Sequence, residues 1–556
     1  MLCLAVSVVS LTGAALLVDP INEQREELQI TVHPDVLENM PPEIAFTQAA
    51  LGSFRGLSVD VLWARVTNMK QEGKLYEARQ LSEMITTLQP RFPQVWAFRA
   101  WDMAYNMSVM THTPEERWMW VSSGVDLLRE KGIPTNPFSI QLYKELAWIF
   151  IHKIGQFSDD MHWYYKRKLA DEWNRILGQP PAGSTEQVID AFRPVAEMYE
   201  DYVDPDREDA GEVESVEAFL DDHPEAAESV EMFRSLGFKL DARLLKRLGF
   251  IRAVLRSADG AVVGRVLQRV DNGEHTDELR DWLQRTDIDQ TRADLMNFLR
   301  ARVLHETYHM DPSFMLELME EIGPLDWRHP ASHGMYWTYL GDRVSEKLRH
   351  LDTKGIDLLN NYRQALHAAQ ALTHNGHVTF DPVSGYYSQL PDPRFIDAYE
   401  KLLFDTPERV TTKYLKESAA PRSFMAGHEN FLIWSIRLSY FYGNKQKASE
   451  LYARVREMYS GEGGDRMVRY AQPLEEFVLT EVTEDLSSLD DARSAVSNFV
   501  IQAIDEGLRN GRVELANRLF TQAERVHDWY DAKWEDPTPN VDRRRMGLPP
   551  FSQMVA

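Results

Sequence analysis

The most constraining feature of the sequence is a glycine–alanine spacing that recurs inside helical periodicity. Nearly every periodic stretch of this 556-residue chain has the spacing of an amphipathic helix, and strand-like alternation is scarce. Glycine permits a tight turn between two helices, and alanine lets the paired helices approach closely. An alanine follows a glycine by five residues in three such turns: Gly73 and Ala78, Gly443 and Ala448, Gly511 and Ala516. The sequence therefore predicts an all-α protein built from stacked antiparallel helical hairpins.

These hairpins resemble tetratricopeptide repeats, a family of stacked helical hairpins whose concave face usually binds peptides or partner proteins. Gly443 and Gly511 lie 68 residues apart, twice the 34-residue period of that family, whereas Gly73 is out of phase. The strings GSFRGLSVDVLWAR, QPRFPQVWAFRAWDMAYN and GPLDWRHPASHGMYW also resemble an uncharacterised family of N-terminally anchored bacterial proteins with such repeats. The resemblance implies a degenerate or interrupted α-solenoid in two lobes. Plain helical hairpins with glycine turns are the alternative.

An acidic segment is expected to separate the two lobes. Glu200–Glu231 holds fourteen acidic residues and one basic residue, Arg207, and this density of like charge favours an extended or solvated segment. The basic stretch Lys239–Arg256 follows, and we expect it to pack against the acidic one, with an acidic partner site as the alternative. The predicted order is an anchor or signal segment at 1–18, a linker at 19–58, repeats at 59–180, an acidic linker or insertion at 181–232, a central helical region at 233–424, repeats at 425–530 and a tail at 531–556.

Leu2–Val18 contains no charged residue and no proline. Its 17 residues at about 1.5 Å rise span roughly 26 Å, the short end of a membrane span. Asp19 and Glu23 follow without a basic cluster, which favours a body on the non-cytoplasmic side, periplasmic or extracellular. We therefore expect a membrane-anchored protein. A signal peptide cleaved after the small residues of TGAA and a buried core helix are the alternatives.

Charge and cysteine content narrow the function. The formal net charge of −25 argues against binding to nucleic acid, because a phosphate backbone requires a basic footprint. Cys3 is the only cysteine, so the chain forms no intramolecular disulfide and no cysteine-based zinc site. No Gly-rich phosphate loop of the P-loop type and no GxSxG motif is present. These features favour a binding protein over an enzyme.

The candidate binding residues follow from the expected stacking. If the hairpins stack as tetratricopeptide repeats do, the first helix of each pair faces a groove for a protein or peptide partner. Tryptophan, tyrosine and arginine dominate such surfaces because they combine large area with hydrogen bonds. The expected groove residues are Asp60, Trp63, Lys70, Trp101, Tyr105, Asn430, Arg437 and Tyr440. The alternative is that Trp63, Trp101 and Tyr105 fill the core between hairpins.

One catalytic motif gives a hypothesis of a different class. His305 and His309 flank Glu306 in an HExxH pattern, which on a helix can place two imidazoles on zinc beside a general base. Gln290–His309 has the periodicity of one helix, which would place the two histidines on one face. The alternative function is therefore a zinc-dependent hydrolase or peptidase, with zinc as its cofactor. Its third ligand would come from a nearby side chain: Glu317, Glu320, Glu321, His329 or His333.

The surroundings of the motif favour a structural role. Pro312 follows His309 by three residues and ends the helix where many zinc peptidases continue theirs. Glu306 lies four residues after Arg302, so an ion pair on one helix face would account for it. We therefore expect a metal-free scaffold.

Overall fold

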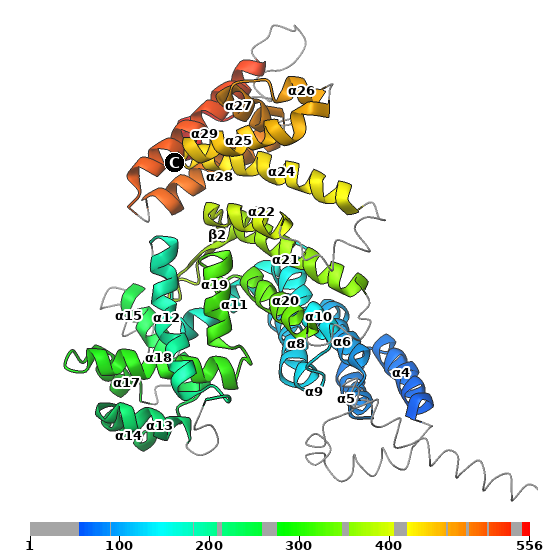
Figure 1. Ribbon diagram of the computed structural model, residues 1–556, viewed down its shortest axis with the longest axis vertical. Helices are drawn as coiled ribbons and strands as arrows, with labels where there is room; N and C mark the ends of the chain where they lie inside the picture. The colour runs from blue at the N-terminus through cyan, green and yellow to red at the C-terminus, as the bar shows by residue number, and fades with distance from the viewer. Residues whose placement is uncertain are drawn as a thin grey trace, which may run out of the picture. The chain divides into compact units, whose positions relative to one another are not determined.

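The computed structural model describes residues 55–88, 90–181, 183–207, 214–257, 275–346, 355–404, 420–462, 465–484, 489–508, 511–534 and 548–555 (Figure 1). The fold is all-α, as predicted, and these described residues include one short β-hairpin. Leu2–Val18 and the predicted linker as far as residue 54 lie outside the described residues. Within the described part of the chain, no helix combines the length and the apolar character that crossing a membrane requires.

The chain divides into two compact units. Unit 1 comprises residues 1–179, 191–317 and 330–368, and unit 2 comprises 180–190, 318–329 and 369–556. Three helices contain residues of both units: α12 (Thr185–Tyr202), α19 (Pro312–Ile322) and α21 (Gly355–Asn375). One break, between residues 190 and 191, lies within the predicted acidic linker at 181–232, and another, between 179 and 180, lies next to its start. The remaining breaks lie elsewhere in the chain.

Unit 1 holds more than half of the described helices. Its α-helices are α4 (Arg55–Gln71), α5 (Leu75–Leu88), α6 (Pro93–Trp101), α7 (Ser108–Met110), α8 (Pro114–Asp126), α9 (Ile133–Thr135), α10 (Ile140–Trp148), α11 (His162–Ile176), α13 (Ser215–Asp222), α14 (Ala227–Ser235), α15 (Ala242–Ser257), α17 (Thr276–Gln284), α18 (Asp289–Glu306) and α20 (Pro330–Glu346). The 3-10 turn η5 (Pro224–Ala226) lies between α13 and α14, and three π-helical segments extend longer helices: η2 (Asp102–Met107), η3 (Leu127–Gly132) and η4 (Ile149–Ile154).

Unit 2 holds the remainder. Its elements are β1 (His377–Phe380), β2 (Tyr387–Leu390), η6 (Pro393–Phe395), α22 (Ile396–Phe404), α24 (Ala420–Phe441), α25 (Lys445–Tyr459), η8 (Ser460–Glu462), α26 (Asp465–Arg469), α27 (Leu474–Glu484), α28 (Leu489–Gln502), η9 (Ala503–Leu508), α29 (Val513–Trp534) and α30 (Phe551–Val555). Strands β1 and β2 pair antiparallel, with His377 opposite Leu390 and Phe380 opposite Tyr387.

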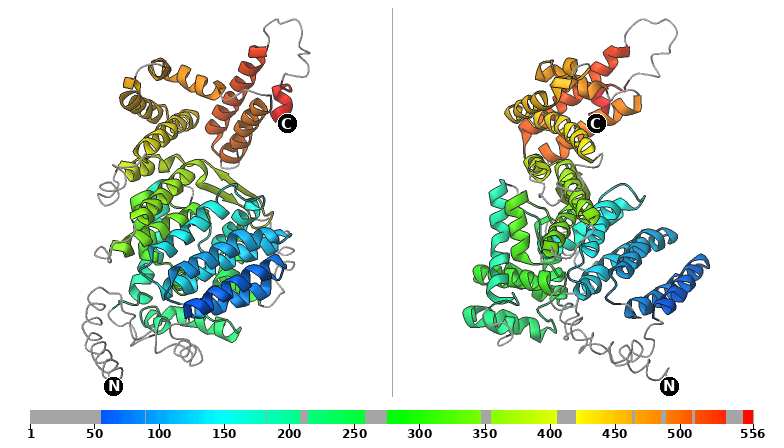
Figure 2. Two further views of the ribbon diagram at one scale, coloured as in Figure 1. Left: turned by 90° about the vertical axis from the view of Figure 1, so that its right-hand side faces the viewer. Right: turned by 45° about the vertical axis from the view of Figure 1, so that its right-hand side comes forward.

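The three predicted hairpin turns are confirmed. Gly73, Gly443 and Gly511 have φ of 74°, 85° and 69°, the left-handed region in which a side chain would be strained. The alanine five residues later has no exposed surface in any of the three. In Figure 2 the helices of the first hairpin, α4 and α5, are the blue pair lying side by side. Glycine turns and buried alanines therefore act as the sequence predicts.

Close backbone approach also organises the middle of unit 1. Helix α20 packs along α10 and η4. Its Gly334 and Gly341 face Ile151 and Tyr143, so that an added Cβ would lie 2.4 and 2.7 Å from the nearest side-chain atoms. Large aromatic side chains on the same helix, such as Trp337, are fully buried. These glycines allow two helices distant in sequence to share one core.

Most of the described acidic segment is helical, in α12, α13 and α14, so it is not the extended chain that was one of the two expectations. Helices α13 and α14 carry apolar residues at helical spacing, and Phe219 stacks on Phe298 of α18 with ring centroids 4.3 Å apart. Burial of such rings outweighs the repulsion between carboxylates that stay in solvent. The basic helix α15 packs mainly against α11, α17 and α18, and its Lys246 pairs with Glu172 of α11 at 2.7 Å.

Candidate functional site

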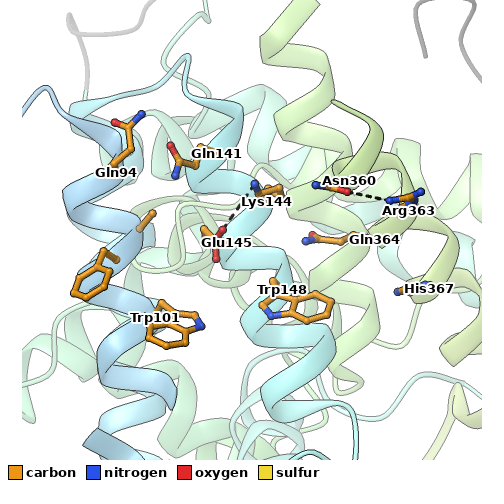
Figure 3. A pocket seen from close by; sticks show the side chains of 12 residues that line it. Gln94, Trp101, Gln141, Lys144, Glu145, Trp148, Asn360, Arg363, Gln364 and His367 are labelled. Atoms are coloured by element: carbon orange, nitrogen blue, oxygen red, sulfur yellow. Dashed lines mark hydrogen bonds and ion pairs between the residues drawn. The ribbon is translucent and has the colours of Figure 1, made fainter. Parts of the chain in front are cut away.

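Unit 1 contains a groove lined by three helices with an identical spacing of side chains. Helices α6, α10 and α21 each contribute residues at relative positions 0, 3, 4 and 7, which form one stripe of a helix. The cavity has a volume of about 750 Å³, and Figure 3 shows its stripes descending in the same direction. The lining residues are Gln94, Ala97, Phe98 and Trp101; Gln141, Lys144, Glu145 and Trp148; and Asn360, Arg363, Gln364 and His367.

The stripes give the groove two chemically different ends. The first position of each stripe is an amide, from Gln94, Gln141 and Asn360 (Figure 3). The last position of each is a ring: Trp101, Trp148 and His367. Amides donate and accept hydrogen bonds, whereas indoles provide broad apolar faces. The groove therefore suits a ligand with a polar backbone and an apolar side chain at one end.

A ladder of rings supports the aromatic end. Six rings in α4, α6, η2, α10 and η4 follow one another with centroid separations between 4.5 and 6.2 Å. In spatial order they are Trp63, Phe98, Trp101, Tyr105, His152 and Trp148. Phe98 and Trp101 nevertheless remain 46% and 38% exposed. Large rings held in fixed positions and open to solvent are typical of a binding surface.

The ladder joins two copies of one local sequence pattern. Gln94–Trp101 reads QVWAFRAW and Gln141–Trp148 reads QLYKELAW, 47 residues further on. The structural elements repeat with the same offset, since α6 with η2 and α10 with η4 have matching bounds. Tyr105 and His152 occupy equivalent positions in the copies, and the Tyr105 hydroxyl lies 3.2 Å from His152 Nδ1. The two copies therefore contact each other through equivalent side chains.

Charged groups on the groove floor are mutually compensated. Lys144 Nζ lies 2.8 Å from an oxygen of Asp357 and 3.9 Å from one of Glu145. Burial raises the pKa of Glu145, although nearby Lys144 opposes that shift. Burial also lowers the pKa of His367, and the charge of Arg363 adds to this effect. The floor therefore favours neutral groups over a ligand of strong charge.

A buried ion pair fixes the outer helix of the ladder. Lys70 of α4 lies 2.5 Å from Asp102 Oδ1, and Asn106 donates to the same oxygen at 2.8 Å. The side chains of Lys70 and Asp102 are 16% and 4% exposed. Lys70 thus ties α4 to η2, whereas the sequence had suggested a direct contact with a partner.

The predicted groove residues fall into two sets. Trp101 lines the groove, while Trp63 and Tyr105 belong to its ring ladder, and Asp60 is exposed on α4. Three others lie on α24 of unit 2, where the Tyr440 hydroxyl donates to Glu475 at 3.1 Å: Asn430, Arg437 and Tyr440. The single groove expected from the sequence therefore corresponds to residues of two separate units.

Sequence reasoning missed most of the lining residues. The repeated pattern of glutamine followed after seven residues by tryptophan was a usable signal for Phe98, Gln141 and Trp148. Helix α21 carries no such copy, because its stripe ends in His367. Its place beside α10 depends on contacts such as that between Lys144 and Asp357, which are 213 residues apart.

The HExxH motif does not have the geometry of a helical zinc site. Helix α18 ends at Glu306, which corrects the expected helix through His309. His309 has a φ of 48°, and the Met310 amide donates to the Leu304 carbonyl at 2.9 Å, a bond that closes the helix end. The two histidines are therefore not successive turns of one helix.

The neighbours of the motif are engaged in structural contacts. The His305 ring lies 5.4 Å from that of Tyr199, and Arg302 donates to Glu306 at 2.7 Å, as the sequence predicts. Of the suggested third ligands, Glu317 pairs with Arg343, Glu321 lies 3.8 Å from Lys401, and His333 is buried against Phe150 and Trp173. No group of three histidine, cysteine, aspartate or glutamate side chains that could hold a metal occurs among the described residues.

Comparison with known proteins gives no assignment. No protein-family model, curated protein or solved structure matches the chain. The class of protein is therefore defined by its fold and its groove: an all-α protein with an aromatic surface on three helices.

Proposed function

We propose that the chain is a membrane-tethered, exported helical-repeat scaffold that binds a peptide segment of a partner protein in the aromatic groove of unit 1. The observation that carries the proposal is the set of three matching stripes, with Phe98 and Trp101 open to solvent. Helical stripes of this kind act as the concave surface in tetratricopeptide-like repeats. The membrane tether rests on the uncharged run Leu2–Val18.

The groove dimensions favour a short extended peptide. Seven residue steps at about 1.5 Å each give a stripe of roughly 10 Å, which matches three residues of extended chain. A volume of about 750 Å³ lies within the range of about 300–1,000 Å³ common for binding pockets. Because the charges on the floor are compensated, the anchoring side chain is neutral and apolar, such as leucine or phenylalanine.

Peptide selection on the full chain tests this proposal. A displayed library of random peptides is selected on the wild-type protein, and the enriched peptides are measured by fluorescence anisotropy. We expect apolar residues flanked by uncharged ones, and at least tenfold weaker binding to Trp101→Ala, because hot-spot tryptophans contribute 2 kcal/mol or more. Trp163→Ala is the matched control, since Trp163 is 50% exposed on α11 outside the groove.

Three outcomes separate the possibilities. Peptides that lose affinity only with Trp101→Ala support the groove. Equal losses in both variants would point to nonspecific aromatic contacts and contradict it. A library that yields no consensus at all would also contradict a peptide-binding groove.

A further inference from the structure

A second cavity in unit 1 is lined by four arginines. It lies among α15, α17 and α18 and has a volume of about 530 Å³. Arg252 and Arg256 come from α15, whereas Arg292 and Arg300 come from α18. Asp289 is the one carboxylate among the described residues that line it. The described lining thus carries an excess of three positive charges.

The guanidinium groups of two of these arginines donate mainly to neutral acceptors, and the other two have no acceptor among the described residues. Arg300 donates to the Ile176 carbonyl at 3.1 Å and to the Asn297 side chain at 2.9 Å. Arg292 pairs with Asp289 and also donates to the Arg285 carbonyl. In the part of the chain that the structure describes, Arg252 and Arg256 form no ion pair or hydrogen bond. Their guanidinium groups are available to a ligand.

Burial and mutual repulsion both disfavour the charged guanidinium groups of the empty cavity. Burial lowers the pKa of Arg300 to about 9, and the charges of Arg252 and Arg256 contribute to this fall. The pKa of Arg252 is lowered by burial and then by Arg256 and Arg292. Like charges gathered around a cavity raise the free energy of the empty site. A bound anion would remove that cost.

We propose that this arginine pocket binds the phosphate group of a phosphate ester or pyrophosphate. Guanidinium groups present planar pairs of donors that match phosphate oxygens, and a ligand with two or three negative charges would balance the excess. Leu255, Leu283 and Met296 line the same cavity and would contact the organic part of an ester. The phosphate can belong to a soluble molecule or to a lipid headgroup, and the pocket recognises the same chemistry in both.

Titration of the full-length protein with inorganic pyrophosphate tests the pocket. Calorimetry at low salt is expected to show one saturable site, with at least tenfold weaker binding in Arg252→Gln and Arg256→Gln. Arg243→Gln is the matched control, because Arg243 lies on the same helix, is exposed and does not line the cavity. It removes the same charge and should leave the affinity within about twofold.

Thermal melting distinguishes a ligand site from a structural cluster. Arg256→Gln should raise the melting temperature of the free protein, since it removes a repelling charge, while it weakens pyrophosphate binding. An arginine that only stabilised the fold would lower the melting temperature. Because the two roles predict opposite changes in the melting temperature, this measurement still distinguishes them if another variant folds poorly.

Vesicle binding identifies the source of the phosphate. Sedimentation compares wild type with Arg252→Gln on phosphatidylglycerol and on phosphatidylcholine vesicles. A difference seen only with phosphatidylglycerol indicates a lipid headgroup, whereas saturable pyrophosphate binding without that difference indicates a soluble ligand. No saturable pyrophosphate binding and no vesicle difference would overturn the proposal, as would an equal loss in Arg243→Gln.

Discussion

Gly249→Ala should destabilise unit 1 although alanine is the better helix former. Gly249 lies inside α15, where a Cβ would come within 1.8 Å of the Arg175 carbonyl oxygen and 2.6 Å of its carbonyl carbon. A carbon–oxygen contact is normally about 3.3 Å, so α15 and α11 would have to separate by roughly 1.5 Å. The obstacle is backbone and cannot rotate away. Overpacking of this kind costs about 3 kcal/mol, and helix propensity returns about 1 kcal/mol, which leaves a net loss of about 2 kcal/mol.

The same displacement would reach neighbouring contacts. The Arg175 guanidinium lies over the Phe250 ring at 4.6 Å, and Lys246 pairs with Glu172 across the same helices. Arg252 follows Gly249 by one turn, so separation of the helices should also weaken pyrophosphate binding. Thermal melting and hydrogen exchange of the α11 and α15 amides measure the two effects.

Gly427→Ala is the matched control for this substitution. Gly427 also lies within a helix, α24, but outside its own helix backbone the nearest atom to an added Cβ is the Tyr399 hydroxyl oxygen, at 3.9 Å. It should stabilise by about 1 kcal/mol through helix propensity alone. A Gly249→Ala protein that melts at or above the wild-type temperature, with unchanged exchange in α11, would refute the close approach of these helices.

Three other predictions test burial, export and metal content. Burial lowers the pKa of Lys166 from 10.5 to about 8, so its destabilisation is fully present below pH 8 and disappears as the pH rises towards 10.5. Lys166→Met should therefore stabilise by about 3 kcal/mol at pH 7, and denaturant unfolding that shows an equal gain at pH 10.5 would contradict this. If Leu2–Val18 is retained as an anchor, the full-length protein should stay with membranes in high salt while a protein starting near Asp19 is released; release of both would exclude an anchor. Elemental analysis should find no stoichiometric zinc, and zinc lost in both His305→Ala and His309→Ala would restore the hydrolase hypothesis.

The parts of the fold that follow from local chemistry were predictable from the sequence. The turns at Gly73, Gly443 and Gly511 depend on a backbone conformation that glycine adopts without strain, and the buried alanines depend on helix spacing. The contact between Arg302 and Glu306 likewise spans four residues of one helix. Interactions of this range are encoded within a few residues.

The parts of the fold that depend on long-range packing could not be predicted from the sequence. Periodicity extended α18 through His309 because apolar spacing continues beyond the point where the backbone turns left-handed. Charge density predicted an extended or solvated acidic segment because it takes no account of apolar packing. Phe219, for example, stacks on a ring of α18. Likewise, the sequence around Arg363 and His367 contains no pattern that would predict a groove shared with Trp101.

The ring ladder explains how Trp101 can be exposed in the groove while its side chain stays in one rotamer. Exposed aromatic side chains normally lose rotamer freedom when a ligand binds, and this loss reduces affinity. Here Trp101 stacks on Tyr105 at 5.8 Å, and Tyr105 reaches His152, which stacks on Trp148 at 4.5 Å. Tyr105 and His152, the equivalent residues of the two copies, thus fix the indoles of Trp101 and Trp148 before a ligand binds. A substitution of His152 that keeps the indoles but breaks this link should weaken peptide binding mainly through a less favourable entropy, which calorimetry measures directly.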